Sequence, residues 1–222
     1  SIEGSSFEGC TNLKNAELLN IVSIGDSSFK DCVSLETIDM PKLQKIGKYG
    51  FQNTGLIEVE LNSANDFPDS YHNAHQFAKC SKLTKITLKM ATRISSNCFL
   101  ECAQLSYVDA PLVTAIDYYS FSGCNSFYNL TFPSVTWIGE GAFKDNSLIT
   151  EVKLDSLNSI EGSSFEGCTN LKNAELLNIV SIGDSSFKDC VSLETIDMPK
   201  LQKIGKYGFQ NTGLIEVELN SA

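Results

Sequence analysis

Hydrophobic positions recur along the whole chain with a period of 22 residues. Phenylalanine marks this period: ten of the thirteen phenylalanines fall in one register, at Phe7, Phe29, Phe51, Phe77, Phe99, Phe121, Phe143, Phe165, Phe187 and Phe209. Each step is 22 residues except the step from Phe51 to Phe77, which is 26. A regular internal period of this length is typical of solenoids, in which each repeat forms one coil.

Other apolar columns keep the same register. An isoleucine usually stands five residues before the phenylalanine, and an apolar triplet with the spacing x, x+3, x+5 follows it, as in Leu35, Ile38 and Met40. The last two members of the triplet have the period-two spacing of a short strand with one buried face. A single coil cannot bury its apolar edge alone, so we predict stacked coils that share a core and a parallel sheet.

One coil shows the full motif L-x-x-I-x-L-P-x-L-x-x-I-G-x-x-x-F, which runs from Leu35 to Phe51 with methionine at the second leucine position. Pro41, Pro111 and Pro133 follow the expected strands. This motif resembles the BspA-like branch of leucine-rich repeats, found in surface proteins of bacteria and protist parasites, and the resemblance covers the entire chain. It implies an α/β-type repeat solenoid with right-handed coils. A parallel β-sheet is expected on the concave face, and short turns or helical pieces on the convex face.

A longer period of 158 residues overlies the short one. Residues 159–222 are identical to residues 1–64, so each long unit contains seven coils. We predict a single solenoid of about ten coils over residues 1–222, which is a segment of a longer array. The absence of differences indicates a duplication that is recent or was made by design. Without polar caps, the ends of such a stack are expected to favour end-to-end self-association.

Composition and charge narrow the function. The formal net charge of −10 argues against nucleic-acid binding, which relies on clusters of lysine and arginine. No apolar stretch approaches the roughly 18 residues of a membrane helix, so we expect no membrane insertion in this segment. The sequence contains no phosphate-binding glycine loop and no nucleophile elbow. Its carboxylates recur with the repeat, as solvated positions do. We therefore predict no enzyme activity and no cofactor.

The cysteines follow the repeat as well. Seven of the eight stand three residues after the phenylalanine, at Cys10, Cys32, Cys80, Cys102, Cys124, Cys168 and Cys190. Thr54, Asn146 and Thr212 replace cysteine in the same column. We interpret these cysteines as reduced, packed thiols that act as small buried hydrophobes. Zinc sites need paired short spacings such as C-x-x-C, which are missing, so no metal site is predicted.

Two regions are candidates for ligand binding. On the concave face, the positions between the apolar residues of the triplets hold Lys85, Lys89, Tyr107, Asp109, Tyr128, Asn129 and Thr131. Exposed tyrosine beside small polar residues is typical of binding surfaces, although tyrosine also suits strands for its own sake. Asn129 to Thr131 is also the only N-glycosylation sequon. Trp137 replaces polar residues of its column and is a further candidate for exposure.

The second region is the insertion that lengthens one coil to 26 residues. It contains Asp66, Asp69, His72 and His75, and loops of this kind often contact partners. Histidine and carboxylate this close together also suit a divalent cation, but a plain polar loop is the simpler interpretation.

These features leave two main functions open. The family resemblance implies a surface module, extracellular or on the cell surface, that recognises a protein or glycan partner through the concave face and the inserted loop. The identical 64-residue segments favour a structural array that supplies length and multivalency. An intracellular scaffold in the cytoplasm is a third alternative, suggested by the unpaired cysteines and by a start that lacks a secretion signal.

Overall fold

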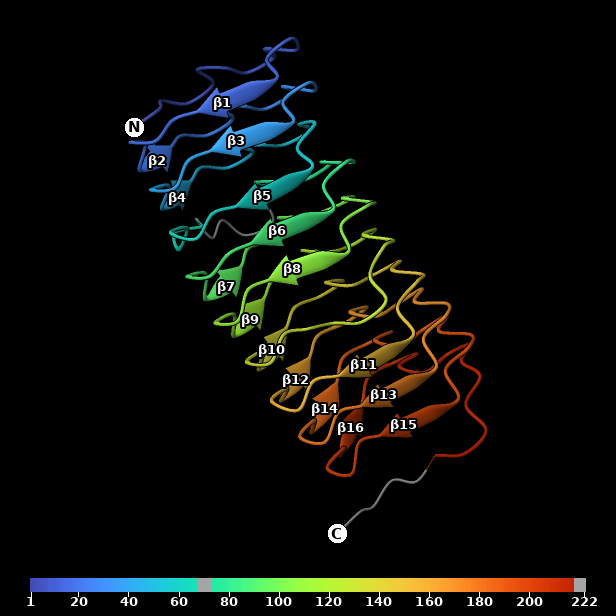
Figure 1. Cartoon of the computed structure of the whole chain (residues 1–222). Coiled ribbons are helices and arrows are strands. Elements are labelled where there is room, and N and C mark those ends of the chain that lie inside the picture. The colour runs from blue at the N-terminus through green and yellow to red at the C-terminus, as the bar shows by residue number, and fades with distance from the viewer. Residues whose placement is uncertain (68–72, 218–222) are drawn as a thin grey trace.

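The chain forms a stack of short coils that builds one elongated solenoid (Figure 1). This computed structural model describes residues 1–67 and 73–217. Within these ranges the regular structure consists of strands two or three residues long, and every pair of strands is parallel. The parallel β-solenoid predicted from the repeat is therefore confirmed.

The last two apolar positions of each triplet lie in or beside a row of three-residue strands, which we name the long-strand row. It contains β1 (Asn15–Glu17), β3 (Thr37–Asp39), β5 (Glu58–Glu60), β6 (Lys85–Thr87), β8 (Tyr107–Asp109), β11 (Glu151–Lys153), β13 (Asn173–Glu175) and β15 (Thr195–Asp197). Its hydrogen-bonded sheets are β1-β3, β5-β6-β8 and β11-β13-β15. The central residue of each strand points into the core, and most of its neighbours are exposed.

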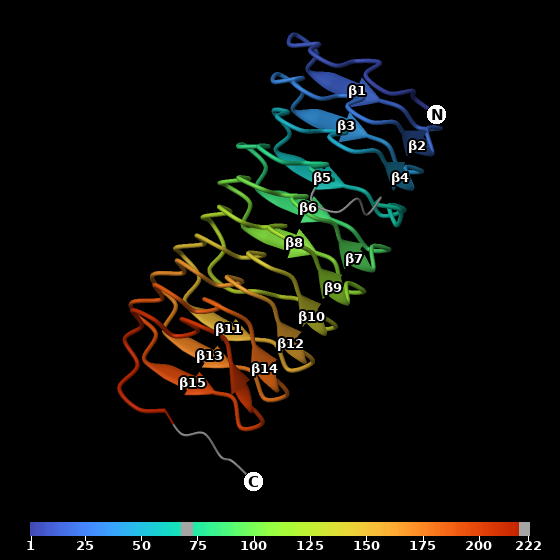
Figure 2. The ribbon, with the colours of Figure 1, turned by 180° about the vertical axis from the view of Figure 1, so that it is seen from behind.

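A second row of strands, which we name the short-strand row, runs beside the first along the whole molecule (Figures 1 and 2). It contains β2 (Ser23–Ile24), β4 (Lys45–Ile46), β7 (Arg93–Ile94), β9 (Ala115–Ile116), β10 (Trp137–Ile138), β12 (Ser159–Ile160), β14 (Ser181–Ile182) and β16 (Lys203–Ile204). Six of these strands form one continuous sheet, β7-β9-β10-β12-β14-β16. The repeat pattern did not predict this row of strands, although its buried side is formed by the recurring isoleucines.

The phenylalanine column is the centre of the core. The ten rings stack in sequence order, with centroids of neighbouring rings between 5.0 and 5.5 Å apart and ring planes within 15° of parallel. The eight inner rings are fully buried, whereas Phe7 and Phe209 at the two ends are half-buried. Each of the eight inner rings contacts the rings of the coils before and after it, so burial of the column depends on stacking.

The phenylalanine segments are turns, and the described residues contain no helix, so none is long and apolar enough to cross a membrane. The expectation of an α/β-type fold with helical pieces is therefore not met. The backbone explains why. The amides of Phe7 and Gly9 donate to the carbonyls of Ser28 and Lys30 in the next coil, at 2.8 Å each, instead of to a residue four positions back. Ser5 and Gly9 have φ values of 55° and 71°, which a right-handed helix cannot contain.

The two identical segments share two long strands with the same register in different surroundings. Strands β1 and β3 in residues 1–64 correspond to β13 and β15 in residues 159–222, with identical register. The second copy continues the stack directly, because β12 at its start pairs with β10 of the preceding coil. The long units thus join without a linker.

Candidate ligand-binding surface

The long-strand row is interrupted between β8 and β11. The intervening segment, residues 127–132, forms no strand, and only an isolated bridge joins Asn129 to Glu151. Consequently β8 ends one sheet and β11 begins the next. The interruption falls on the coil that holds Tyr128, Asn129 and Thr131.

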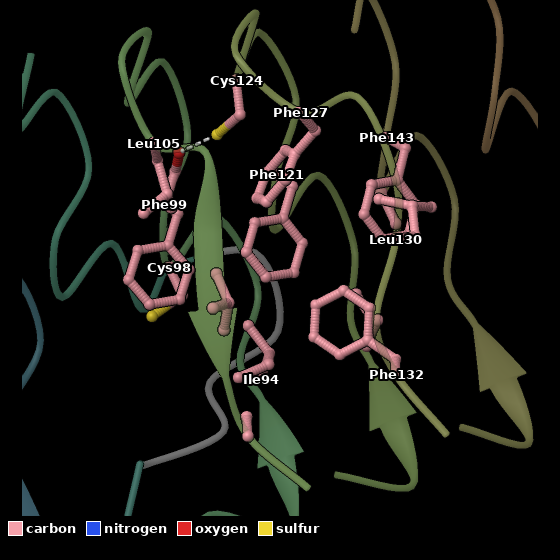
Figure 3. Packing of buried hydrophobic residues seen from close by; sticks show 14 of the residues in the cluster. Ile94, Cys98, Phe99, Leu105, Phe121, Cys124, Phe127, Leu130, Phe132 and Phe143 are labelled. Carbon is pink, nitrogen blue, oxygen red and sulfur yellow. Dashed lines mark hydrogen bonds between the residues drawn. The ribbon is translucent and has the colours of Figure 1, made fainter. Parts of the chain in front are cut away.

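Two additional aromatic rings accompany this interruption. Phe127 and Phe132 occupy triplet positions that hold Leu105 and Ala110 in the preceding coil. The ring of Phe127 meets Phe121 edge-on, with centroids 5.6 Å apart and planes at 89°. Phe132 lies 5.6 Å from Phe121 (Figure 3). Because packed cores do not compress, the larger rings require more width than a leucine and an alanine, and we attribute the lost strand pairing to them.

A hollow of about 220 Å³ opens at the interruption. It is lined by Ser106, Tyr107, Val108, Phe127, Tyr128, Asn129, Thr131 and Phe132. The side chains of the two tyrosines remain accessible, since Tyr107 is 48% exposed and Tyr128 60% exposed. The structure thus brings four of the predicted ligand-binding residues together: Tyr107, Tyr128, Asn129 and Thr131.

The other three predicted residues of this face lie beside the hollow and are not part of its lining. Lys85 pairs with Tyr107 across β6 and β8, and its ammonium nitrogen lies 5.9 Å from the centre of the tyrosine ring. Lys89 forms an ion pair with Asp109. The Lys85 ammonium group thus packs against the Tyr107 ring, and the Lys89 and Asp109 charges neutralise one another.

A second hollow of about 510 Å³ adjoins the first. It is lined by Leu130, Thr131, Phe132, Pro133, Lys153, Leu154 and Asp155. Thr131 and Phe132 line both hollows, the first of which lies toward β8 and the second toward β11. Sequence reasoning missed Lys153 and Asp155, because nothing in the repeat pattern marks a coil next to an interruption.

The structure describes only two of the four candidate residues of the inserted loop. Asp69 and His72 lie outside the described residues. Asp66 bridges to Lys45 in the backbone, and its carboxylate lies 3.8 Å from the Lys45 ammonium group. The His75 ring stacks on Tyr49, with centroids 5.3 Å apart. Among the described residues, no three His, Cys, Asp or Glu side chains are grouped in a way that could hold a metal ion. A role of this loop in binding stays a prediction.

The cysteine column has a polar role that the sequence interpretation omitted. The thiol of Cys124 donates to the carbonyl of Phe99 in the preceding coil at 3.0 Å (Figure 3), and Cys102 does the same to Phe77. Asn146, which replaces cysteine, donates to the carbonyl of Phe121 at 2.7 Å. The column is therefore occupied by small side chains that donate hydrogen bonds, and not simply by small apolar groups.

All eight cysteines are free thiols, and seven are buried. Burial raises the pKa of the Cys190 thiol from 9.0 to about 12, and it also raises the pKa of the Cys98, Cys124 and Cys168 thiols. Because the thiolate is the nucleophilic form, these buried groups are unsuited to covalent catalysis.

Trp137 lies in the short-strand row and is half-buried. Its ring meets Tyr118 edge-on at 5.9 Å, and the Arg93 guanidinium lies 6.0 Å from its centre. Arg93 in turn forms an ion pair with the buried carboxylate of Asp117, at 2.6 Å. These contacts explain the tryptophan as packing within the short-strand row, and its side chain does not line the hollow.

The chain belongs to the BspA-type leucine-rich repeat family. Its sequence matches the model of the BspA type leucine rich repeat region (6 copies) over residues 1–112 and 92–216. A comparison with curated proteins gives no match.

Several solved structures share the fold. A leucine-rich repeat protein from Eubacterium ventriosum has a TM-score of 0.55 at 15% identity, with 100% of this chain and 83% of that chain covered. A leucine-rich cell surface protein from Faecalibacterium prausnitzii has a TM-score of 0.51 at 18% identity, with the same coverage. The pneumococcal vaccine antigen PcpA has a TM-score of 0.57 at 17% identity, with 90% of this chain and 57% of that chain covered. At these identities the similarity shows the fold alone.

Proposed function

We propose that this chain is a non-catalytic surface module that binds a protein or glycan partner through the hollow between β8 and β11. The observation that carries the proposal is the grouping of Tyr107, Tyr128, Asn129 and Thr131 around one accessible hollow. Tyrosine gives a large contact area at low entropic cost, and the small polar groups supply hydrogen bonds. The raised pKa of the buried Cys98, Cys124, Cys168 and Cys190 thiols fits a module without catalytic chemistry.

An extracellular or cell-surface location fits this proposal. The Faecalibacterium prausnitzii protein that shares the fold is described as a cell surface protein, and PcpA is described as a vaccine antigen. A module on a cell surface meets partners from outside the cell, for which an accessible hollow on a rigid solenoid is suited.

Alanine substitution of the two tyrosines tests the proposal. The purified chain is screened against immobilised extracellular matrix proteins and oligosaccharides, and the ligand found is titrated against Tyr107→Ala and Tyr128→Ala. We expect each variant to bind at least about tenfold more weakly, because exposed aromatic side chains in a site carry much of the binding energy.

Tyr207→Ala is the matched control. Tyr207 is 63% exposed but does not line the hollow, so its loss should leave the affinity unchanged. Unchanged binding by both hollow variants, or an equal loss in the control, would refute the proposal.

The second candidate function is a structural array, which the exact duplication favours. Residues 159–222 repeat the sequence of residues 1–64, β13 and β15 have the register of β1 and β3, and the second copy continues the stack. In such an array the repetition supplies length and avidity, and the surface common to both copies carries the function.

A further inference from the structure

The lining of the first hollow is aromatic and uncharged. Its polar groups are the phenols of Tyr107 and Tyr128, the Asn129 amide, and the hydroxyls of Ser106 and Thr131. These groups both donate and accept hydrogen bonds, and the tyrosine rings offer flat apolar faces. A sugar ring has complementary features, since its C–H face packs on an aromatic ring while its hydroxyls take part in hydrogen bonds.

Two lysine ammonium groups beside the hollows are paired with carboxylates of the protein. The Lys89 ammonium group pairs with Asp109, and Lys153 lies 2.7 Å from Glu175. Glu151 bridges to Asn129 and places a negative charge beside the hollow. With a net charge of −10 on the chain, anionic ligands such as sulfated or sialylated glycans are disfavoured.

The surroundings also disfavour a protein partner. The core of a protein interface is depleted in charged residues and usually spans roughly 800 Å² on each side. Here the strands that flank the hollow present Lys85 on one side and Glu151 and Lys153 on the other. The residues that line the first hollow are uncharged, and this hollow of about 220 Å³ fits a small ligand better than a broad protein surface.

The adjoining hollow gives such a ligand room to extend. Thr131 and Phe132 line both hollows, and the ionisable residues of the second one, Lys153 and Asp155, have opposite charges. We infer that the site takes an uncharged oligosaccharide, with one sugar ring on Tyr128 and the following sugars over Thr131. This inference rests on the proposed function and names the ligand class of the same site.

An oligosaccharide array tests the inference. The full chain is produced in bacteria, so that the Asn129 sequon carries no glycan, and is applied to neutral, sialylated and sulfated oligosaccharides. We expect binding to neutral members, with less than about a twofold change between 50 and 500 mM salt, since no ion pair is formed with the ligand. Tyr128→Ala should weaken this binding at least about tenfold, whereas Tyr128→Phe, which keeps the ring, should weaken it less.

The possible failures are distinguishable. If the chain binds a protein, Tyr128→Ala abolishes this binding, and enzymatic deglycosylation of the protein leaves it intact, the glycan inference is overturned. The proposed function would still stand. Binding of sulfated or sialylated oligosaccharides alone, lost in Tyr128→Ala, would also overturn the inference of an uncharged ligand and leave the proposed function standing. If no probe shows binding that depends on Tyr107 or Tyr128, the proposed function fails, and the inference fails with it.

Discussion

At the scale of single residues, side-chain hydrogen bonds fix the contact between neighbouring coils. Cys102, Cys124 and Asn146 each donate to the carbonyl of a phenylalanine in the preceding coil. Ser120 donates in a similar way, to the carbonyls of Asp117 and Ser95. From the sequence, the cysteine column was interpreted as apolar filler because cysteine often packs as a small hydrophobe. The threonines and the asparagine in the same column were the signal that a donor is required.

Substitutions of Cys124 separate the contribution of side-chain volume to stability from the contribution of the hydrogen bond. Valine and threonine have nearly the same shape, but only threonine keeps a donor. We expect Cys124→Val to lower the free energy of unfolding by about 1 kcal/mol more than Cys124→Thr, the typical net value of one such bond. Urea denaturation followed by circular dichroism measures the difference. Equal stability of the two variants would show that the column requires volume alone.

At the scale of elements, the strand rows differ in how far the sequence predicts them. The spacing of the apolar triplets predicted the long-strand row, whose central residues are buried as expected. The pattern also predicted a strand over Leu130 and Phe132, since Phe127, Leu130 and Phe132 form a triplet with the same spacing. That pattern records apolar character and not volume, so it could not show that two phenylalanines interrupt the pairing. The hollow, and with it the grouping of the candidate residues, depends on this difference in volume.

Two phenylalanines with identical neighbouring sequences test whether each coil is stabilised by the coils stacked on it. Phe165 is the copy of Phe7, but it is fully buried between Phe143 and Phe187, whereas Phe7 is half-buried and contacts only Phe29 in the ring column. We expect Phe165→Ala to lower the free energy of unfolding by about 3–5 kcal/mol. Phe7→Ala should cost less than half of that loss.

Denaturant unfolding of both variants and the unsubstituted chain gives the comparison. The local sequences are the same, so a difference between the two losses reports the coverage by neighbouring coils. Equal losses would mean that each coil is stable by itself, contrary to the account of a shared core.

At the scale of the whole molecule, the coil that holds residues 127–132 departs from the regular pattern, as does the longer coil that holds the insertion. The 158-residue period is continued without a linker, and β13 and β15 have the register of β1 and β3. Residues 127–132 have no copy in this chain, so the hollow occurs once among the described residues. A function of the hollow therefore predicts that the ligand contacts residues 127–132. A function of the repetition predicts that it contacts both copies of the repeated segment.

Hydrogen–deuterium exchange of the backbone amides, measured with and without the captured ligand, distinguishes these places of contact most directly. The account predicts that bound ligand slows exchange of the amides in residues 106–109 and 127–132, whereas β1 and β13, which are identical in sequence, exchange as they do without ligand. Slower exchange in both β1 and β13, with residues 127–132 unchanged, would place the function on the repeated surface and contradict the account.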